Sequence, residues 1–535
     1  SPSRGLGDVY KRQGVRAAGG GAAGGATGPI RFRSVRLHFS ARTASADVQG
    51  QVDGIVDKRR KGVYGPPHGW RALVSCDDCA MPAMGAYGAQ PPLELLRQLL
   101  EQGGWYERKG GSFRALLDVQ LLCAMAPAGG GRNRISARFS RALHAIAAVE
   151  PDERALCSIF DTIYTAHLEQ GVAPAGGAER GGAERSSFEL PVRSLRARLS
   201  LATVRLHAAV AASLLPTPSR SHYTFSLRDA RRLVLGVCRA TPSAPYRTAE
   251  SLVRLWAHEA ERVYADRLVD VPDRQTFRAL LDGALRAHFA SSYTALVAGG
   301  RGGGGGGDGD GNGNGDGSGG GGGTGDDGGD SLLFTSFVPP SFGAAAATAA
   351  TGASMPPLLA SASTPSERPA GAAASAALAD EARRAVARAR TTSAEPPPYA
   401  HAEGGARAAL VVLHAFLAEQ NAQSPREAPA LVLFEYAAVH VCRLTRLLGT
   451  PHGHALLVGL GGSGRQSLAK LATHVVGGSF HRPQNAARSY GAAEWRDDLK
   501  RVLALAGGGA RPRTSGGASS AAGALGGGGD GDGGG

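Results

Sequence analysis

The sequence predicts an α/β protein in which a mostly parallel sheet with flanking helices is joined to an all-helical subdomain. Three observations predict this class. Strand-like and helix-like segments alternate between residues 30 and 170, and helical periodicity then continues through residues 187–298. A short apolar run at 455–458 precedes a glycine-rich loop and a further helical pattern. Alternation of strands and helices is typical of parallel sheets, whose crossover connections are usually helical.

The first strand in chain order is the apolar run Arg71–Ser75, which ends beside Asp77 and Asp78. A strand that delivers paired acids at its end is what a Walker B element needs. There the first carboxylate holds Mg²⁺, and the second orients or activates the attacking water. An Asp-Asp pair is also a common start of a turn or a helix, and from these residues alone that alternative stays open.

Helix and strand signals follow these acids in turn. Pro91-Pro92 and Gly103-Gly104 delimit a helix at Leu93–Gln102. A second strand is expected at Asp118–Met125, and the loop 126–133 leads to a helix that starts at Ser136.

Residues 187–298 are expected to form a helical subdomain with its own core. One helical face carries its apolar residues at helical spacing: Leu252, Leu255, Trp256, Ala260, Val263 and Tyr264. Core packing explains the Trp and the Tyr better than a ligand-binding role does.

The most informative segment is a glycine loop that follows the predicted buried strand Ala455–Val458 and precedes the predicted helix Arg465–Val476. Glycines let successive backbone N–H groups converge on an anion, and the helix N-terminus adds partial positive charge. This predicts a nucleotide phosphate-binding loop made of Gly459, Leu460, Gly461, Gly462, Ser463, Gly464, Arg465, Gln466 and Ser467.

The loop departs from the pattern G-x-x-x-x-G-K-[ST] at its end. Arg465 stands where Lys is expected, and its planar fork reaches differently from a Lys point charge. Gln466 stands where a hydroxyl normally binds magnesium, and Ser467 comes one position late. A glycine-rich turn without a ligand is the alternative interpretation.

Low-complexity segments interrupt these regions. Of the 535 residues 79 are Gly, and they are concentrated in Gly302–Asp330 and from Gly507 onward, while 344–389 is rich in Ala, Ser, Thr and Pro. Such segments bury too little apolar surface to offset the entropy of ordering, so we expect them to be disordered.

The net charge of +14 does not by itself indicate a nucleic-acid partner. Arg is spread along the chain, and Lys58–Lys61 is the one tight basic run, which is better explained as a solvated turn. No apolar run is long enough to span a membrane. Cys76 and Cys79 have C-x-x-C spacing, but a second ligand pair does not follow, so buried thiols at a strand end are expected.

Several segments together resemble dynein heavy chains, more the axonemal than the cytoplasmic kind. They are Lys58–Pro67, Tyr87–Arg97, Gly129–Asn133, His222–Asp229, Leu431–Glu435 and the loop Gly459–Ser467. Their order resembles the later part of the third AAA+ module and the start of the fourth. The resemblance implies AAA+ P-loop NTPase modules, each with a parallel sheet, flanking helices and a helical lid.

The resemblance also implies a domain order. Residues 1–29 are expected to be non-native or disordered, 30–170 to form the large subdomain of the third module without its N-terminal part, and 187–298 to form the helical lid. A disordered insertion or linker at 299–404 precedes the start of the fourth module at 405–506, with a disordered tail at 507–535. A trace of similarity remains at Leu332–Val338.

The resemblance assigns roles to four charged positions and marks one departure from the family segment. Asp77 corresponds to the Walker B acid that binds Mg²⁺, and Asp78 stands where a catalytic Glu is expected, so efficient hydrolysis is in doubt. Ala80 replaces an Asn of the family segment Leu-Asn-Met-Pro. Arg138 corresponds to an arginine finger that reaches the nucleotide of a neighbouring module, and Arg228 to a lid arginine that contacts nucleotide.

By resemblance, the chain is expected to be a fragment of an axonemal dynein heavy chain, a microtubule motor that hydrolyses ATP in the cytoskeleton of cilia and flagella. Its modules would bind ATP or ADP with Mg²⁺ in a mainly regulatory role, without completing hydrolysis as an isolated fragment. The expected partners are neighbouring modules and, through the full-length chain, intermediate and light chains and microtubules; no nucleic acid or membrane is expected. A catalytically inactive AAA+ scaffold is the alternative.

Overall fold

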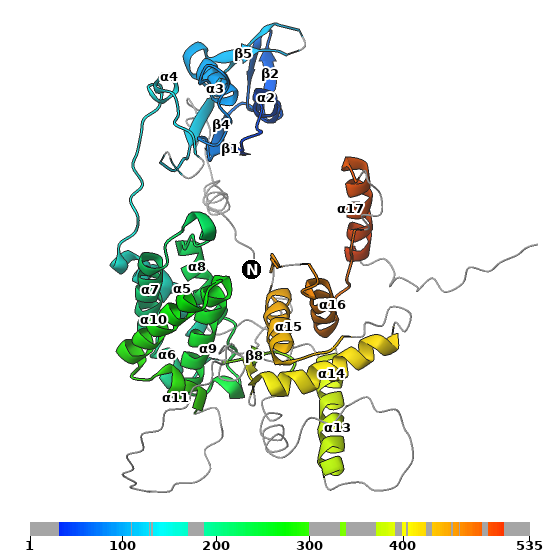
Figure 1. Cartoon of the computed structure of the whole chain (residues 1–535). Helices are drawn as coiled ribbons and strands as arrows, with labels where there is room; N and C mark the ends of the chain where they lie inside the picture. The colour runs from blue at the N-terminus through cyan, green and yellow to red at the C-terminus, as the bar shows by residue number, and fades with distance from the viewer. Residues whose placement is uncertain are drawn as a thin grey trace, which may run out of the picture. The chain divides into compact units, whose positions relative to one another are not determined.

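The computed structural model describes residues 31–108, 110–127, 129, 132–169, 187–298, 332–338, 371–390, 399–402, 405–423, 431–450, 453–459, 461–483 and 490–507. These residues fall into two compact units, 1–150 and 151–535 (Figure 1). The disorder predicted for 1–29, for Gly302–Asp330 and for the tail after Gly507 concerns residues outside the described ranges.

The first unit is an α/β subdomain, as the sequence predicts. Its elements in chain order are β1 (Arg31–His38), α2 (Ser45–Asp53), β2 (Asp57–Arg60), β3 (Val63–Gly65), β4 (Trp70–Asp77), α3 (Pro91–Gln102), β5 (Gly104–Tyr106), β6 (Phe113–Leu116), β7 (Val119–Cys123) and α4 (Ala137–Ser140). The predicted strands at Arg71–Ser75 and Asp118–Met125 and the predicted helix at Leu93–Gln102 are confirmed by β4, β7 and α3.

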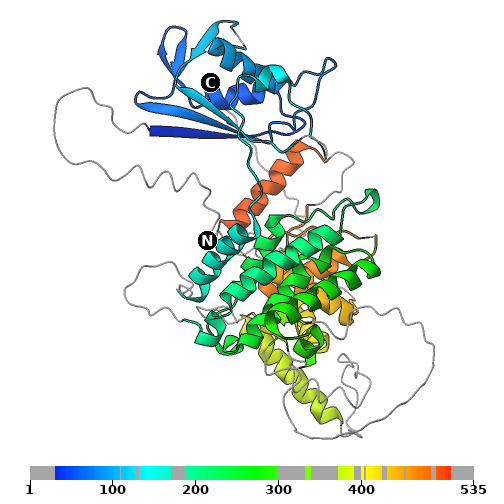
Figure 2. The ribbon, with the colours of Figure 1, turned by 90° about the vertical axis from the view of Figure 1, so that its left-hand side faces the viewer.

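A parallel sheet in the order β1-β4-β7 forms the centre of this unit, with β4 in the middle. Every second residue of β4 is fully buried, namely Ala72, Val74 and Cys76. Helices α2 and α3 lie on one side of the sheet (Figure 2). Helix α3 has Leu93 and Leu96 in the same core and ends at Gly103, whose φ of 68° favours glycine. A smaller sheet has the order β2-β3-β6-β5.

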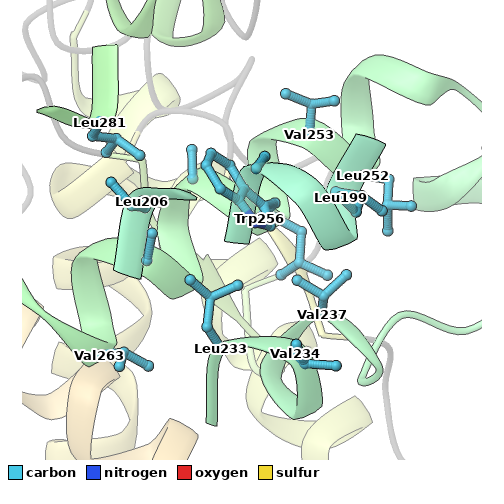
Figure 3. Packing of buried hydrophobic residues seen from close by; sticks show 14 of the residues in the cluster. Leu199, Leu206, Leu233, Val234, Val237, Leu252, Val253, Trp256, Val263 and Leu281 are labelled. Carbon is cyan, nitrogen blue, oxygen red and sulfur yellow. The ribbon is translucent and has the colours of Figure 1, made fainter. Parts of the chain in front are cut away.

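The second unit begins with helices that form the predicted helical subdomain. They are α5 (Glu153–Leu168), α6 (Leu190–Arg193), α7 (Arg196–Ser213), η1 (Pro218–Arg220), α8 (Leu227–Val237), η2 (Ala244–Tyr246), α9 (Ala249–Val263), η3 (Ala265–Arg267), α10 (Val271–Phe289) and α11 (Tyr293–Ala298). Trp256 of α9 is fully buried, and Leu199, Leu206, Leu233 and Leu281 come from the helices around it (Figure 3). The predicted core face of residues 252–264 is therefore confirmed.

Helix α5 differs from the sequence expectation. Residues 151–170 were expected to belong to the α/β subdomain, but Phe160, Tyr164 and Leu168 are buried in the core of the helical subdomain. These three residues lie four apart and make one apolar helical stripe, which needs a helical partner to cover it. The helical body thus begins near Pro151.

The rest of the second unit has its own core. Its elements are β8 (Phe334–Thr335), α13 (Gly371–Arg390), β9 (Ala400–His401), α14 (Gly405–Gln423), α15 (Glu435–Leu448), α16 (Arg465–Val476) and α17 (Ala492–Ala506). Residues 332–338 contribute to both cores of this unit. Leu332 and Phe334 are buried in the core of the helical subdomain, and Leu333 and Phe337 are buried in the core of the remaining elements.

Helix α13 and the strand pair β8–β9 correct the expectation that 299–404 is disordered throughout. Ala has the highest intrinsic helix propensity, and the predicted low-complexity segment is rich in it. Ala382, Ala385 and Val386 of α13 are buried in the second core, so tertiary packing supports this helix.

A buried polar network links the helical subdomain to α15. Glu259 of α9 is fully buried and forms a two-pronged ion pair with Arg446 of α15, including an Nε–Oε1 distance of 2.9 Å. The Tyr399 hydroxyl lies 3.3 Å from Glu259 Oε1 and 3.0 Å from His258 Nε2. A Cβ at Gly236 would lie 2.0 Å from Glu259 Oε2, so only glycine leaves room for this carboxylate.

None of the described helices combines the length and the apolar character that a membrane span requires.

Candidate functional site

The predicted Walker B acids lie where the sequence places them, at the carboxyl end of β4. Asp77 is the last residue of this middle strand and is exposed. It is the register partner of His38, whose Nδ1 lies 3.6 Å from Asp77 Oδ2. In open parallel sheets, ligands bind outside the carboxyl ends of the strands. Asp77 therefore presents its carboxylate at the edge where a nucleotide would be expected.

Asp78 forms the turn that follows the strand. Its φ of 55° lies in the left-handed region, which Asp tolerates better than most residues. The Met81 N–H donates to the Asp78 carbonyl at 2.9 Å. Both interpretations of the Asp-Asp pair therefore apply, one to each residue, because Asp77 ends the strand and Asp78 forms the turn. The Asp78 side chain is exposed.

The loop after the acids is held by two side chains that the sequence analysis did not single out as site residues. Gln90 Nε2 donates to the Pro82 carbonyl at 2.8 Å, and Asn133 Nδ2 donates to the same oxygen at 2.9 Å. The Asn133 backbone N–H donates to the Ala80 carbonyl at 3.0 Å. Both residues lie in segments that carried the family resemblance. Their side-chain hydrogen bonds hold this loop in place, which the methyl group of Ala80 cannot do.

His38 is a further residue that the sequence analysis missed. It ends β1, and only the parallel register of β1 with β4 places it beside Asp77. Its signal in the sequence was the strand-like alternation of Val35, Leu37 and Phe39 with polar residues.

Arg138 lies on α4, a helix of one turn. The helix starts where predicted, because the Ser136 hydroxyl accepts a hydrogen bond from the Phe139 N–H at 3.3 Å. Phe139 anchors it with a fully buried ring. Arg138 is exposed and, among the described residues, forms no hydrogen bond or ion pair. Arg141 by contrast pairs with Glu101 at 2.8 Å.

The prediction of a strand before the glycine loop is wrong. Residues 453–459 have no strand, and Leu456 and Val458 are 88% and 86% exposed. A strand needs a neighbour to take up its backbone hydrogen bonds, and none of the described strands pairs with this segment. An apolar run alone therefore does not determine whether the strand forms.

The glycine loop and its helix do have the expected local form. Gly462 and Gly464 have φ angles of 81° and 71°, a conformation that glycine adopts freely. Gly464 caps α16, and Leu468 is the first residue whose N–H bonds back to it, at 2.9 Å. The backbone N–H groups of residues 465–467 precede this first helical bond and so face the loop. Leu460 lies outside the described residues.

Helix α16 is fixed in the second core by Leu471, Ala472 and Val475. His474 Nε2 lies 3.2 Å from Glu419 Oε2 of α14. At the N-terminal end of the helix, Gln466 is exposed and Arg465 and Ser467 are half-buried. The helix thus has a buried anchor and an accessible N-terminus, which is the arrangement that an anion site requires.

Arg228 lies in the first turn of α8 and is exposed. It makes no hydrogen bond or ion pair to another described residue. Its neighbour Asp229 is buried, accepts from the Ser226 N–H at 2.9 Å and pairs with Arg267 at 3.1 Å. The helix is therefore held by Asp229, and Arg228 remains available.

The predicted site residues are divided between the two units. Asp77, Asp78 and Arg138 belong to the first unit, whereas Arg228 and the glycine loop belong to the second. No group of three or more His, Cys, Asp or Glu side chains in the described ranges is arranged to hold a metal ion by itself. Mg²⁺ in nucleotide sites typically takes one or two carboxylates together with phosphate oxygens, so Asp77 fits such a role.

The C-x-x-C cysteines are buried free thiols, as predicted. Hydrogen bonding to the Cys123 thiol, and then burial, raise the pKa of Cys79 well above its usual range. A hydrogen bond with Cys76 raises the pKa of Cys123 to about 12, with burial adding to this effect and the bond from Cys79 opposing it. The three sulfur atoms thus lie together at the carboxyl end of β4 and β7.

Three protein families match this chain, each over a different part. The family described as "P-loop containing dynein motor region" matches residues 27–151, and "Dynein heavy chain, ATPase lid domain" matches 186–274. The family described as "P-loop containing dynein motor region D4" matches 430–514. The matched ranges agree with the α/β unit, the helical subdomain and the region around the glycine loop.

Curated relatives match almost the whole chain. Dynein axonemal heavy chain 1 of Mus musculus is 31% identical over 480 residues, which are 90% of this chain. The protein of the same name from Homo sapiens is 32% identical over 88% of the chain. The Dynein-1-beta heavy chain, flagellar inner arm I1 complex, of Chlamydomonas reinhardtii is 31% identical over 90%. The chain spans only 9%, 9% and 8% of these relatives.

Proposed function

Because this chain belongs to the dynein heavy chain family, we propose that it is part of the motor region of an axonemal dynein heavy chain. The complete protein would be an ATP-hydrolysing microtubule motor of the ciliary or flagellar cytoskeleton. The described units would correspond to the later part of the third AAA+ module, its lid, and the start of the fourth. Neighbouring modules, intermediate and light chains and microtubules would be its partners.

The observation that carries this proposal is the placement of Asp77 at the carboxyl end of the middle strand of a parallel sheet. A bound Mg²⁺ would supply charge neutralisation at the β- and γ-phosphates of ATP. Asp77 would hold that ion directly. Gln90 and Asn133 would keep the following loop in place through the Pro82 carbonyl.

The nature of Asp78 supports a mainly regulatory role for this site. Asp78 is one methylene shorter than Glu, and it lies on a turn with positive φ. A base must come within about 3 Å of the water that it activates, so a shorter side chain reaches less well. We propose that the site binds nucleotide and changes conformation with it, while turnover there is slow.

In the second unit, the N-terminus of α16 would bind a phosphate group through its backbone N–H groups. Arg465 would add positive charge, and the side chains of Gln466 and Ser467 would be left to meet the metal ion or its water. Arg228 would reach nucleotide from the lid. The local form of the loop and the exposure of Gln466 and Arg228 support these roles.

Arg138 provides the test. Its free guanidinium at a helix anchored by Phe139 fits an arginine finger that acts on the nucleotide of the preceding module. Such fingers contribute about 10³- to 10⁵-fold to turnover. In the intact motor, Arg138→Ala should slow single-turnover phosphate release at that neighbouring site by at least about tenfold.

Arg141→Ala is the matched control, because Arg141 follows Arg138 on the same segment but pairs with Glu101. The control should leave phosphate release unchanged. Equal rates in the Arg138→Ala variant and the parent protein would remove the finger role. Circular dichroism of both variants establishes that neither change unfolds the subdomain.

A catalytically inactive scaffold is the second candidate. Two observations favour it, namely Gln466 in place of a hydroxyl and the exposed, unpaired segment 455–458. The two candidates differ in turnover, because only the motor predicts ATP hydrolysis by the intact protein that carries these modules.

A further inference from the structure

The small sheet of the α/β unit, in the order β2-β3-β6-β5, has one buried face and one open face. Neighbouring residues along a strand point to opposite faces of a sheet, and register partners on adjacent strands share a face. Trp105 of β5 and Leu116 of β6 lie on the buried face, because both are part of the core of this unit. Tyr106 follows Trp105 on its strand and is the register partner of Phe113, so these two rings lie on the open face.

The two aromatic rings on the open face form a fixed pair. Tyr106 and Phe113 are 57% and 36% exposed, and their ring centroids lie 5.2 Å apart in an edge-to-face arrangement. Helix α2 holds this part of β5, because Gln49 Nε2 donates to the Tyr106 carbonyl at 2.9 Å. Aromatic residues are enriched at the centre of protein interfaces. An exposed aromatic pair on a supported strand is therefore a suitable anchor for a partner.

The β2–β3 hairpin supplies positive charge to the same face. Arg60 of β2 is the register partner of Val63, and Val63 is the register partner of Ala115. Ala115 lies two residues from Phe113 on β6, so Arg60 shares the face of the aromatic pair. The strand register shifts between Lys58 and Arg60, and irregularities of this kind re-aim side chains.

Arg59 is the member of this basic run that the fold uses. It pairs with Asp118 at 2.6 Å, and a Cβ at Gly65 would lie 2.8 Å from its Nε atom, so glycine leaves room for this guanidinium. Arg60 and Lys61 are exposed and form no hydrogen bond or ion pair with another described residue. The run therefore belongs to a fixed hairpin and differs from the solvated turn that the sequence predicts.

We propose that the open face of the small sheet binds a segment of another protein in which apolar side chains are flanked by carboxylates. The apolar side chains would pack on Tyr106 and Phe113, and the carboxylates would pair with Arg60 and Lys61. Apolar contact would supply most of the affinity, while the complementary charges would fix the orientation and speed the association. Binding at this face uses neither the paired acids nor the glycine loop, so it is independent of the function proposed above.

The aromatic pair favours a protein segment over a single-stranded nucleic acid. Proteins that bind single strands stack successive bases on aromatic side chains along a basic groove. On the described part of this face, Tyr106 and Phe113 contact each other edge to face and form a single pair. A compact apolar anchor beside two cations suits a short acidic segment better.

Fluorescence anisotropy of the full chain with a labelled peptide tests this proposal. The probe is a short peptide with a pair of phenylalanines between glutamates, and a second probe has lysine in place of each glutamate. We expect saturable binding of the glutamate probe, which added salt weakens because the charges are exposed. The lysine probe should bind at least about tenfold more weakly. Equal affinity for the two probes, or no saturable binding of the glutamate probe, would overturn the proposal.

Matched substitutions locate the binding face. Tyr106→Ala and Arg60→Glu should each weaken binding of the glutamate probe at least about tenfold. Phe32→Ala and Arg33→Glu are the controls, because both residues are exposed on β1, outside the small sheet, and they should leave the affinity unchanged. Circular dichroism checks the fold of each variant, and Lys61→Glu in the hairpin turn repeats the charge test. Equal losses in Arg60→Glu and Arg33→Glu would show a response to net charge alone and would contradict the proposed face.

A competition experiment distinguishes the two classes of partner. The unlabelled glutamate peptide and a single-stranded oligonucleotide are each added to the complex of the full chain with the labelled probe. We expect the peptide to displace the probe at a concentration at least about tenfold lower than the oligonucleotide does. Displacement by the oligonucleotide at an equal or lower concentration would assign this face to nucleic acid and overturn the proposal.

Discussion

The helical unit and the acidic edge of the α/β unit use charged side chains in opposite ways. In the helical unit, Glu259 is 0% exposed and is met by Arg446 and Tyr399. At the edge of the α/β unit, Asp77 and Arg138 are exposed, and the His38 Nδ1 atom lies 3.6 Å from an Asp77 carboxylate oxygen. A buried charge costs several kcal/mol unless its partners are in place.

The buried charges therefore stabilise the fold, whereas the exposed charges are available for binding and chemistry. The Glu259 carboxylate is bonded to Arg446 and Tyr399, so this pair holds α9 against α15 and is not available to a ligand. The exposed acids and Arg138 contribute little to folding and keep their capacity for a metal ion, a phosphate or water. The comparison predicts that substitutions in the two regions will affect different measurements.

The largest effect is expected at the buried ion pair. Arg446→Ala leaves the Glu259 carboxylate buried without its cation and should lower the free energy of unfolding by about 3–5 kcal/mol. Urea denaturation of the full chain, followed by circular dichroism, measures this. Arg407→Ala is the control, because its pair with Glu435 is largely exposed and should contribute only about 0–1 kcal/mol. Equal losses in the two variants would contradict the comparison.

A titratable side chain beside this network gives an intermediate effect. Burial, and then the positive charge of Arg254, lower the pKa of His401 to about 4. Between pH 6.5 and 4 the unfolded chain therefore takes up a proton at this residue that the folded chain does not. Stability falls as the pH is lowered through this window, by up to about 3 kcal/mol.

The variant His401→Gln isolates this contribution. The difference in free energy of unfolding between His401→Gln and the parent chain should grow in favour of the variant from pH 7 to pH 4. Other buried groups titrate in both proteins, so the difference reports His401 together with its electrostatic effect on the neighbouring His258. Parallel curves for the two proteins over this range would show that His401 is not the group responsible.

Much of the fold could be predicted because the signals are local. Strand β4, helix α3 and helix α16 are each marked by an apolar pattern and by Pro or Gly at their ends, and all three form within a few residues of the prediction. Helix α13 was missed because its Ala-rich composition is that of a low-complexity segment. Its stability depends on the contacts of Ala382 and Val386 with a distant part of the chain.

The site could be predicted only in part, for the same reason. Asp77 and Asp78 are consecutive residues, and their position at a strand end is visible in the sequence. His38 and Asn133 lie 39 and 56 residues from Asp77, and only the strand register and a loop contact bring them to the acids. Conversely, the strand predicted at 455–458 from its apolar residues does not form, because a strand also needs a neighbouring strand to pair with.

The smallest effect is expected at Arg228, and the neighbouring Asp229 provides the matched comparison. Arg228→Ala removes an exposed side chain without a partner in the described structure and should change the free energy of unfolding by less than about 0.5 kcal/mol. Asp229→Ala removes the carboxylate that accepts from the backbone N–H of the N-cap residue Ser226 and pairs with Arg267, and should cost at least about 1 kcal/mol. Urea denaturation of both variants measures the contrast. A loss at Arg228 as large as that at Asp229 would mean that the exposed arginine supports the fold, and its role would then be structural instead of directed to a ligand.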